Sequence, residues 1–408
     1  MICGLLGEKL SHSFSPQIHS HLGDYNYALF EKNADELDDF FKNESFHGIN
    51  VTIPYKKTVI PYCHKLTPQA QKIGAVNTVV RSGDGTLIGH NTDYFGFRSM
   101  ASRFGITYQD KKVLVLGSGG ASNTVCAVME ELGAKVVVIS RNGENNYQNI
   151  SKYTDCAVIV NTTPVGMYPN TGVSPVNLKL FPKLEGVMDL IYNPFRTRLL
   201  LDAEQMGIPA ENGLWMLIAQ AWESAQWFLG RGIPEERISA IYHILKNQIE
   251  NIILVGMPGS GKSTVGKLLA EKLNKSFVDT DTQIEILTGR KIPEIFQTDQ
   301  EDGFRKLESK VIAEFGMKNG QVIATGGGCV TKEENYALLR QNGTIFWIQR
   351  DISALSTDGR PLSQSNDLYQ MYASRKQMYE RFADFSVSNS STPIQTVHMI
   401  LQKLEERI

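Results

Sequence analysis

Two phosphate-binding loops of different chemistry lie in one chain of 408 residues. The later loop, Gly256–Ser263, fits the pattern GxxxxGK[ST], in which backbone N–H groups surround the phosphates of a nucleoside triphosphate. In this pattern Lys262 reaches the β- and γ-phosphates and Ser263 holds Mg²⁺. The earlier loop, Gly117–Ser122, fits the dinucleotide fingerprint, in which a pyrophosphate meets the N-terminus of a helix. Two such loops predict two active sites.

The strand that follows the first loop bears on the choice of dinucleotide. It ends Ile139-Ser140-Arg141, where an acidic residue would read the ribose hydroxyls of NAD. Arg141 can instead pair with a 2′-phosphate, so the sequence favours NADP(H). The alternative is a solvated arginine at the end of a strand.

Apolar runs alternate with helical stretches and position both loops. The expected strands are 49–53, 112–116, 136–139 and 251–255, with a first strand within 1–7, and the expected helices are 214–228 and 234–247. Continuous β-branched runs between helices predict α/β domains with parallel sheets covered on both faces. A boundary falls near Lys246–Asn251, without a Gly/Pro/Ser-rich linker.

Composition excludes several classes of protein. The chain has 41 basic and 43 acidic side chains, a net charge of −2, so nothing favours a nucleic-acid or membrane-surface partner. Its five cysteines are scattered without CxxC pairing, which favours reduced thiols and a cytoplasmic location. We expect no signal peptide and no membrane span, because no apolar run approaches ~18 residues.

Residues 1–248 contain a series of short motifs that together resemble shikimate dehydrogenase. The motifs are 11–16 (SHSFSP), 50–56 (NVTIPYK), 74–78 (GAVNT), 91–93 (NTD), 161–167 (NTTPVGM), 189–194 (DLIYNP) and 216–221 (MLIAQA). The resemblance implies an α/β substrate domain over 1–96 plus 213–248 and a Rossmann-like NADP domain over 97–212. It also implies reduction of 3-dehydroshikimate to shikimate.

The same resemblance implies roles for individual residues. Lys56, held near Asp93, is the expected acid/base, because a tuned and oriented lysine can protonate a forming alkoxide. The alternative for this pair is a structural ion pair. The remaining expected contacts are, for the substrate carboxylate, Ser13, Ser15, Thr52 and Tyr192; for the ring hydroxyls, Asn77, Asp93 and Gln220; and for NADP(H), Gly117, Gly119, Gly120, Ala121, Ser122, Arg141, Asn161, Thr162 and Gly213.

Residues 250–408 resemble shikimate kinase, a P-loop domain with a parallel sheet. After the loop come 277–281 (FVDTD), expected to close the next strand, then 304–308 (FRKLE), Gly326–Gly328, 359–362 (GRPL) and Arg375. The resemblance implies transfer of a phosphate from ATP to shikimate, giving shikimate 3-phosphate. The two resemblances support each other, since the product of the first reaction is the substrate of the second.

Phosphoryl transfer needs neutralised charge and an oriented hydroxyl. By resemblance, Asp281 orients the acceptor hydroxyl, and Arg305 and Arg375 clamp the substrate carboxylate with their guanidinium forks. Alone, these arginines would more often be surface ion-pair partners. The other expected contacts are Gly256, Gly259, Ser260, Gly261, Lys262, Ser263 and Thr264 for ATP; Ser263 and Asp279 for Mg²⁺; Gly327 and Gly328 for the ring; and Arg360 as the lid residue over the phosphates.

The chain departs from both families in places. Asn123-Thr124 stands where the dehydrogenase loop usually has a basic residue, and 142–146 (NGENN) favours a turn after Arg141. The lid segment 353–359 lacks an arginine that often lies over adenine. Alternatives are a cyclic-carboxylate sensor, an enzyme with one inactive half, and a dehydrogenase that uses quinate. The expected partners are small molecules only.

Overall fold

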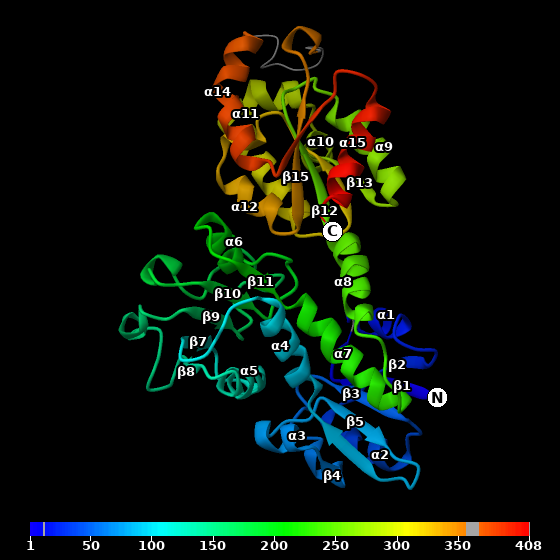
Figure 1. The fold of residues 1–408 in the computed structure, drawn as a ribbon. Coiled ribbons are helices and arrows are strands. Elements are labelled where there is room, and N and C mark those ends of the chain that lie inside the picture. Colours follow the sequence, from blue (N-terminus) through cyan, green and yellow to red (C-terminus); the bar gives the residue numbers. More distant parts are fainter. Residues whose placement is uncertain (11–12, 356–366, 408) are drawn as a thin grey trace. The chain divides into compact units, whose positions relative to one another are not determined.

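The protein is described by a computed structural model that covers residues 1–10, 13–355 and 367–407. The chain forms two compact units (Figure 1). The first unit comprises Met1–Gly166, Ser174–Tyr192 and Asp202–Ile244, and the second comprises Met167–Val173, Asn193–Leu201 and Leu245–Ile408. Within the described ranges, no helix combines the length and apolar content that a membrane crossing needs.

The first unit begins with a mixed sheet in the order β2-β1-β3-β5-β6-β4. Its strands β3, β5 and β6 pair antiparallel, whereas β2, β1 and β3 run parallel. The strands are β1 (Ile2–Gly7), β2 (Asn26–Glu31), β3 (Gly48–Val51), β4 (Lys65–Leu66), β5 (Thr78–Arg81) and β6 (Leu87–His90). The helices of this part of the chain are α1 (Ser15–Ser20), α2 (Leu37–Asn43), α3 (Pro68–Ile73), α4 (Thr92–Arg103), α7 (Leu214–Leu229) and α8 (Glu236–Ile249).

Strand β3 is shorter than the sequence predicted. It ends at Val51, and Ile53 is 77% exposed. The chain turns there, because Pro54 has no N–H to offer a sheet and the Tyr55 N–H donates to the Thr52 carbonyl over 2.9 Å. The expected strands at 112–116 and 251–255 are confirmed, as are the two expected helices: α7 ends one residue later than expected, and α8 begins and ends two residues later.

A second sheet in the first unit is wholly parallel, in the order β11-β10-β9-β7-β8. Its elements are β7 (Lys112–Leu116), α5 (Gly120–Glu131), β8 (Lys135–Ile139), β9 (Val158–Asn161), β10 (Gly186–Asp189), α6 (Arg198–Gln205) and β11 (Ala210–Asn212). Buried side chains of β7, α4 and α5 share one core, with Val113, Phe97 and Val128 fully buried. Helix α4 is thereby fixed against the second sheet.

The second unit contains a parallel sheet in the order β13-β14-β12-β15-β16. The strands are β12 (Asn251–Val255), β13 (Ser276–Asp279), β14 (Gln321–Ala324), β15 (Gly343–Gln349) and β16 (Phe385–Ser388). The helices are α9 (Lys262–Leu273), α10 (Thr280–Thr288), α11 (Ile292–Gly316), α12 (Glu334–Arg340), α14 (Leu368–Phe382) and α15 (Pro393–Glu405). Helix α11 is broken at Gln300, where φ is 59°.

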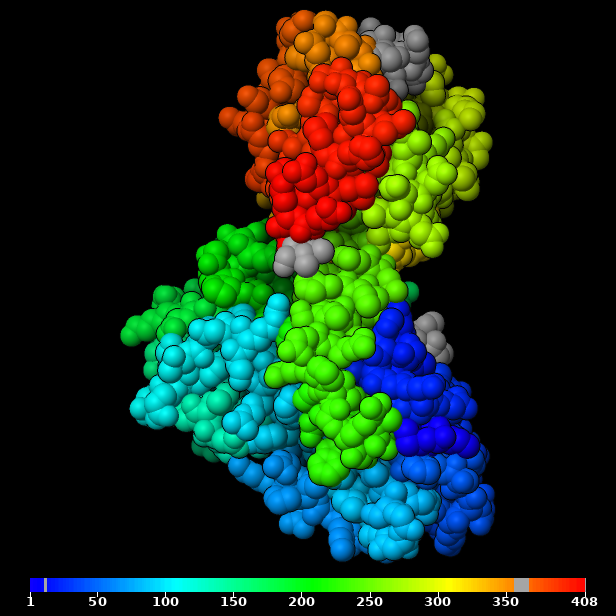
Figure 2. Space-filling model, turned by 45° about the vertical axis from the view of Figure 1, so that its right-hand side comes forward, coloured from blue at the N-terminus to red at the C-terminus, as the bar shows by residue number. Residues whose placement is uncertain are grey.

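Both faces of this sheet are buried, as the continuous apolar runs predicted. Along β12, Ile253 and Val255 join one core, and Ile252 and Leu254 join the other, because side chains alternate across a strand. Helices α9 and α15 cover the second core through Leu269 and Ile400. Figure 2 shows α15, in red, at the surface beside the yellow-green segment that contains α9. The sheet therefore holds the loop after β12 between two packed layers.

Candidate active sites

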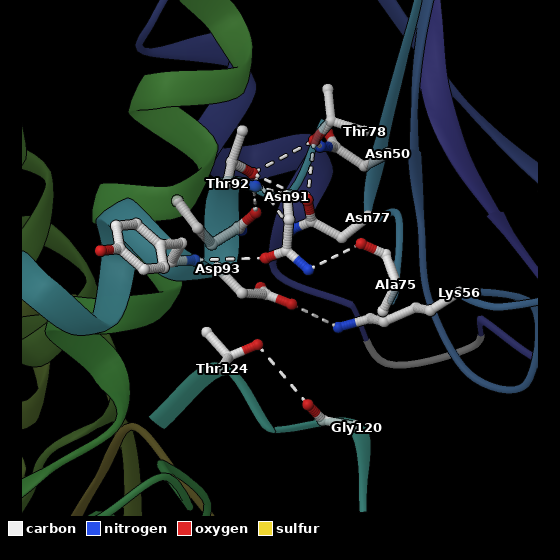
Figure 3. A network of polar contacts seen from close by, with 12 residues as sticks. Asn50, Lys56, Ala75, Asn77, Thr78, Asn91, Thr92, Asp93, Gly120 and Thr124 are labelled. Atoms are coloured by element: carbon white, nitrogen blue, oxygen red, sulfur yellow. Dashed lines mark hydrogen bonds and ion pairs between the residues drawn. The ribbon is translucent and has the colours of Figure 1, made fainter. Parts of the chain in front are cut away.

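An ion pair stands at the junction of the two sheets of the first unit. The Lys56 ammonium lies 2.6 Å from Asp93 Oδ2, and the two side chains are 31% and 15% exposed (Figure 3). Lys56 follows the turn after β3, and Asp93 is the second residue of α4. The structure thus brings together the two residues that the sequence predicted as a pair. A half-buried lysine oriented by a carboxylate is suited to acid/base chemistry.

A buried network fixes the start of α4 and therefore Asp93. Asn91 caps the helix by accepting from the Tyr94 N–H and donates its own amide to the Ala75 carbonyl over 2.9 Å. Asn77 Oδ1 accepts from the Thr92 N–H over 2.7 Å. Figure 3 shows these amides converging beside the Lys56–Asp93 pair. Gln220, on α7, reaches the same network through Thr92 Oγ1 at 3.5 Å.

The residues expected to hold a carboxylate come from three separate segments. Ser13 Oγ accepts from the N–H of the buried Ser15 over 3.1 Å, at the start of α1. The ring of Tyr192 lies 6.0 Å from that of Phe14, between ring centroids, so it reaches the same segment. Burial raises the pKa of the Tyr192 phenol, which keeps the hydroxyl protonated as a donor. Thr52 follows the end of β3 and is half-buried.

The carboxyl ends of β7 and β9 form the edge of the sheet at which dinucleotides bind in this strand order. Strand β7 has β8 on one side and β9 on the other, which is a topological switch point. Gly117 follows β7 with φ +109°, and Thr162 after β9 donates to the Leu116 carbonyl over 2.7 Å. A Cβ at Gly119 or Gly120 would meet nothing within 4 Å, so the start of α5 is open to a ligand. These residues fit a bound NADP(H).

Other predicted cofactor residues take different positions. Asn161 is fully buried and donates to Asp189 Oδ1 over 3.0 Å, so its amide organises the loop after β9. Gly213 leaves room for the chain itself, since a Cβ there would lie 2.0 Å from the Leu190 carbonyl oxygen. Ser122, on α5, is 1% exposed, so its side chain lies on the buried face of that helix. Arg141 is exposed after β8, before the bends and turns that the Asn-rich sequence predicted.

The second unit places its P-loop between β12 and α9. The Lys262 side chain is 7% exposed, and its ammonium donates to the Gly256 and Met257 carbonyls over 2.8 and 2.9 Å. Ser263 Oγ donates to Asp279 Oδ2 over 2.5 Å. Two hard oxygen ligands therefore adjoin at the loop, which is the donor set that Mg²⁺ prefers. Among the described residues, no group of three or more His, Cys, Asp or Glu side chains could hold a metal ion by itself.

A carboxylate with an unusual environment stands next to this pair. Strand β13 ends at Asp279, two residues earlier than the sequence predicted, because Asp279 caps α10 by accepting from the Asp281 N–H over 3.1 Å. Asp281 therefore lies in the first turn of a helix, with its Oδ1 buried and without a hydrogen-bond partner. Burial above all, then Glu308 and Asp279, raises the pKa of the Asp281 carboxyl to about 7. Such a carboxyl can accept a proton near neutral pH.

Two buried arginines define the other end of this site. Arg305 Nη1 donates to the fully buried Glu308 over 2.7 Å, and its Nη2 pairs with Glu301 over 3.0 Å. Arg375, on α14, is 8% exposed and donates to the Gly327 carbonyl over 3.3 Å. Buried guanidinium groups with donors left over are suited to a carboxylate ligand.

The glycine run Gly326–Gly328 packs so closely against its neighbours that side chains would not fit there. A Cβ at Gly328 would lie 2.0 Å from Arg305 Nη2, and one at Gly327 would lie 2.5 Å from Pro258. The loop thus packs directly on the arginine and on the P-loop. The resulting cavity has a volume of about 330 Å³ and joins Lys262, Asp281, Arg305 and Arg375. Arg360, the expected lid residue, lies outside the described residues.

Several residues of these sites were given no role from the sequence. Glu308 pairs with Arg305 at a spacing of three on α11, a spacing that could have suggested the pair. Tyr379 donates to the Gly327 carbonyl, beside Arg375. Asn91 belongs to the motif at 91–93, and its role as the N-cap of α4 could have been inferred from its place before a helix. Arg350, which also lines the cavity, had no sequence signal.

These features define two classes of enzyme in one chain: a dehydrogenase of the Rossmann type and a P-loop kinase. The family model "Shikimate dehydrogenase substrate binding domain" matches residues 5–79, and that of shikimate kinase matches residues 258–405. A shikimate dehydrogenase (NADP(+)) of Clostridium perfringens is 34% identical over 265 residues, which are 60% of this chain and 97% of that protein.

Solved structures agree with this assignment. A chorismate mutase/shikimate 5-dehydrogenase fusion protein from Clostridium acetobutylicum is 37% identical and has a TM-score of 0.57, over 60% of this chain and 97% of that one. Shikimate 5-dehydrogenase from Thermus thermophilus, in complex with NADP(H) and shikimate, is 28% identical and has a TM-score of 0.54, over 60% and 99%. The chain belongs to the shikimate dehydrogenase family, and a shikimate kinase domain follows in the same chain.

Proposed function

We propose that this enzyme reduces 3-dehydroshikimate to shikimate with NADPH and then phosphorylates shikimate with ATP to shikimate 3-phosphate. One observation carries the proposal: a single chain joins a shikimate dehydrogenase to a shikimate kinase domain, so the product of one site is the substrate of the other. The Lys56–Asp93 ion pair of the first unit and the buried Asp281 carboxyl of the second support the proposal.

In the reductase, a bound NADPH supplies the hydride that reaches the ring carbonyl carbon. Lys56 donates a proton to the carbonyl oxygen as it becomes an alkoxide, and Asp93 keeps the ammonium oriented for this transfer. We assign the substrate carboxylate to Ser13, Ser15, Thr52 and Tyr192, and the ring hydroxyls to Asn77, Asp93 and Gln220. The loop at Gly117–Ser122 and the segment at Asn161–Thr162 hold the dinucleotide.

Arg141 is the residue that we assign to the 2′-phosphate of NADPH. It is exposed at the end of β8, and no acidic residue stands beside it in the sequence. Arg141→Ala is therefore expected to raise the KM for NADPH about tenfold, the equivalent of ~1.4 kcal/mol, and to leave that for NADH within twofold. Initial rates with each cofactor measure this. Equal losses for the two cofactors would mean that Arg141 supports the fold of the turn instead.

In the kinase, Lys262 and the P-loop N–H groups hold the nucleotide phosphates, and Ser263 and Asp279 are the residues that would hold Mg²⁺. Mg²⁺, when bound, neutralises phosphate charge. The Asp281 carboxylate orients the acceptor hydroxyl and takes its proton as the oxygen attacks the γ-phosphorus. Arg305 and Arg375 clamp the ring carboxylate while Gly327 and Gly328 let the ring approach, and Arg360 is assigned to the lid.

The clamp is testable through the glycine that adjoins it. Gly328→Ala places a methyl group 2.0 Å from Arg305 Nη2, so the guanidinium must move away from its place in the cavity. We expect the KM for shikimate to rise about tenfold or more while the KM for ATP stays within threefold. Steady-state kinase rates with each substrate varied measure this, and the reductase rate of the same variant is the control. A rise in the KM for ATP alone would place Arg305 in the wrong subsite.

The proposed pair of reactions is tested by assaying each half alone. NADPH oxidation with 3-dehydroshikimate tests the reductase, and ADP formation from shikimate and ATP tests the kinase. Quinate with NADP⁺ belongs in the same experiment, because quinate is the alternative substrate of the dehydrogenase. A sensor would bind these ligands without turnover, and an enzyme with one inactive half would show one activity. Small-molecule partners and a cytoplasmic location, which the scattered cysteines favour, remain part of the proposal.

A further inference from the structure

An arginine without an assigned role projects into the kinase cavity. Arg350 is the first residue after β15, is exposed, and lines the cavity together with Lys262 and Gly259. Strand β15 pairs with β12 in a register that places Trp347 opposite Val255. Val255 is the last residue of β12 and leads directly into the P-loop, and Arg350 follows just past the end of the neighbouring strand. The residue emerges next to the P-loop.

The charge of Arg350 is not used within the described part of the chain. By contrast, the two arginines of the clamp each have a protein partner: Arg305 pairs with Glu308 and Glu301, and Arg375 donates to the Gly327 carbonyl. In residues 1–10, 13–355 and 367–407, no ion pair or hydrogen bond engages the Arg350 guanidinium. An unpaired guanidinium on a ligand cavity is a ready partner for an anion.

The sheet order decides which anion this is. Strands β13 and β14 lie on one side of β12 and bring Asp279, Asp281 and the glycine run to the cavity, whereas β15 lies on the other side. Asp281 and the glycine run thus come from the side away from β15, whereas Arg375 comes from α14, which packs on β15. On the β15 side, Asn389 at the end of β16 donates to the Ser260 carbonyl over 2.8 Å and holds the P-loop there. Arg350 consequently stands at the nucleotide end of the cavity.

We propose that Arg350 binds the β-phosphate of the nucleotide, opposite Lys262, and so determines much of the affinity for ATP and ADP. This inference rests on the proposed kinase function. It also accounts for a departure of the sequence, because the lid segment lacks an arginine over adenine and Arg350 supplies a cation from a strand end instead. A guanidinium presents two parallel N–H donors to phosphate oxygens, which a lysine cannot do.

The test measures binding of ADP and of AMP to the full chain by calorimetry, without shikimate. Arg350→Ala is expected to weaken ADP binding about tenfold and to leave AMP binding within twofold, because AMP has no β-phosphate. Arg350→Lys should recover part of the loss, and Arg350→Gln should not. Arg381→Ala is the matched control, since Arg381 is 59% exposed, pairs with Glu333 and does not line the cavity.

In turnover, Arg350→Ala should raise the KM for ATP about tenfold with the KM for shikimate unchanged. Equal weakening of ADP and AMP would overturn the assignment, because it would show an effect on the nucleoside or on the loop. Unchanged ADP binding, or loss of shikimate affinity alone, would overturn it as well. A parental chain that binds ADP but does not phosphorylate shikimate would refute the proposed function and leave the binding result readable by itself.

Discussion

A chain with Lys56→Met is expected to lose roughly 10²–10⁴-fold of its reductase turnover, the usual contribution of a general acid/base group. The loss should fall on kcat, because the ammonium is needed when the carbonyl oxygen takes on charge. Methionine keeps the length of the side chain but leaves Asp93, which is 15% exposed, without its cation. Stopped-time or continuous measurement of NADPH oxidation with saturating 3-dehydroshikimate gives the effect.

The neighbouring lysine offers a matched control for this experiment. Lys57 is exposed, and Lys57→Met makes the same chemical change one residue away. It should leave reductase turnover within twofold, and both variants should keep the parental kinase rate because they lie in the first unit. A Lys56→Met chain with near-parental reductase turnover would show that the Lys56–Asp93 pair is structural.

The second large effect is expected at the kinase carboxylate. Asp281→Asn keeps the shape of the side chain and removes the base, so kinase turnover should fall roughly 10²–10⁴-fold. ADP binding should persist, because the P-loop of Gly256–Ser263 is untouched. Calorimetry with ADP and a rate assay with shikimate separate the two. An Asp281→Asn chain that turns over near the parental rate would remove Asp281 from the chemistry.

The pH dependence of the kinase rate also tests Asp281 as the base. The carboxyl must be ionised to accept a proton, and its pKa is raised to about 7, chiefly by burial. Kinase kcat/KM should therefore fall about tenfold per unit as pH drops below this value and level off above it. Asp279 caps the same helix, so the pH profile of an Asp279→Asn chain is the comparison for that of Asp281→Asn. If the rate stays flat down to pH ~5, near the ordinary range of aspartate, Asp281 is not the base.

Much of the fold could be predicted because local signals and tertiary packing agree. Strands β7 and β12 are continuous apolar runs buried on both faces, and each is followed by a glycine-rich loop. The ends of elements were less certain. Strand β3 stops at Val51 because Pro54 forces a turn, and β13 stops at Asp279 because its side chain caps α10.

The site residues could be predicted where they belong to a recognisable sequence motif. Lys56 and Asp93 are 37 positions apart, and only the fold of β3 and α4 onto one edge brings them to 2.6 Å. The burial that raises the pKa of Asp281 depends on packing among three segments, so the sequence could not supply it. Arg350 could not be found at all, since its place beside the P-loop follows from the pairing of β15 with β12.

The measurement that tests the central claim most directly is one coupled reaction. The purified chain is given 3-dehydroshikimate, NADPH and ATP, and NADP⁺, ADP and shikimate 3-phosphate are followed together. We expect all three to form at equal rates once shikimate reaches its steady level. In a Lys56→Met chain, ADP formation from 3-dehydroshikimate should stop, whereas ADP formation from added shikimate should continue. NADP⁺ formation with accumulating shikimate and no ADP, or ADP formation that ignores NADPH, would contradict the account of two consecutive active sites in one chain.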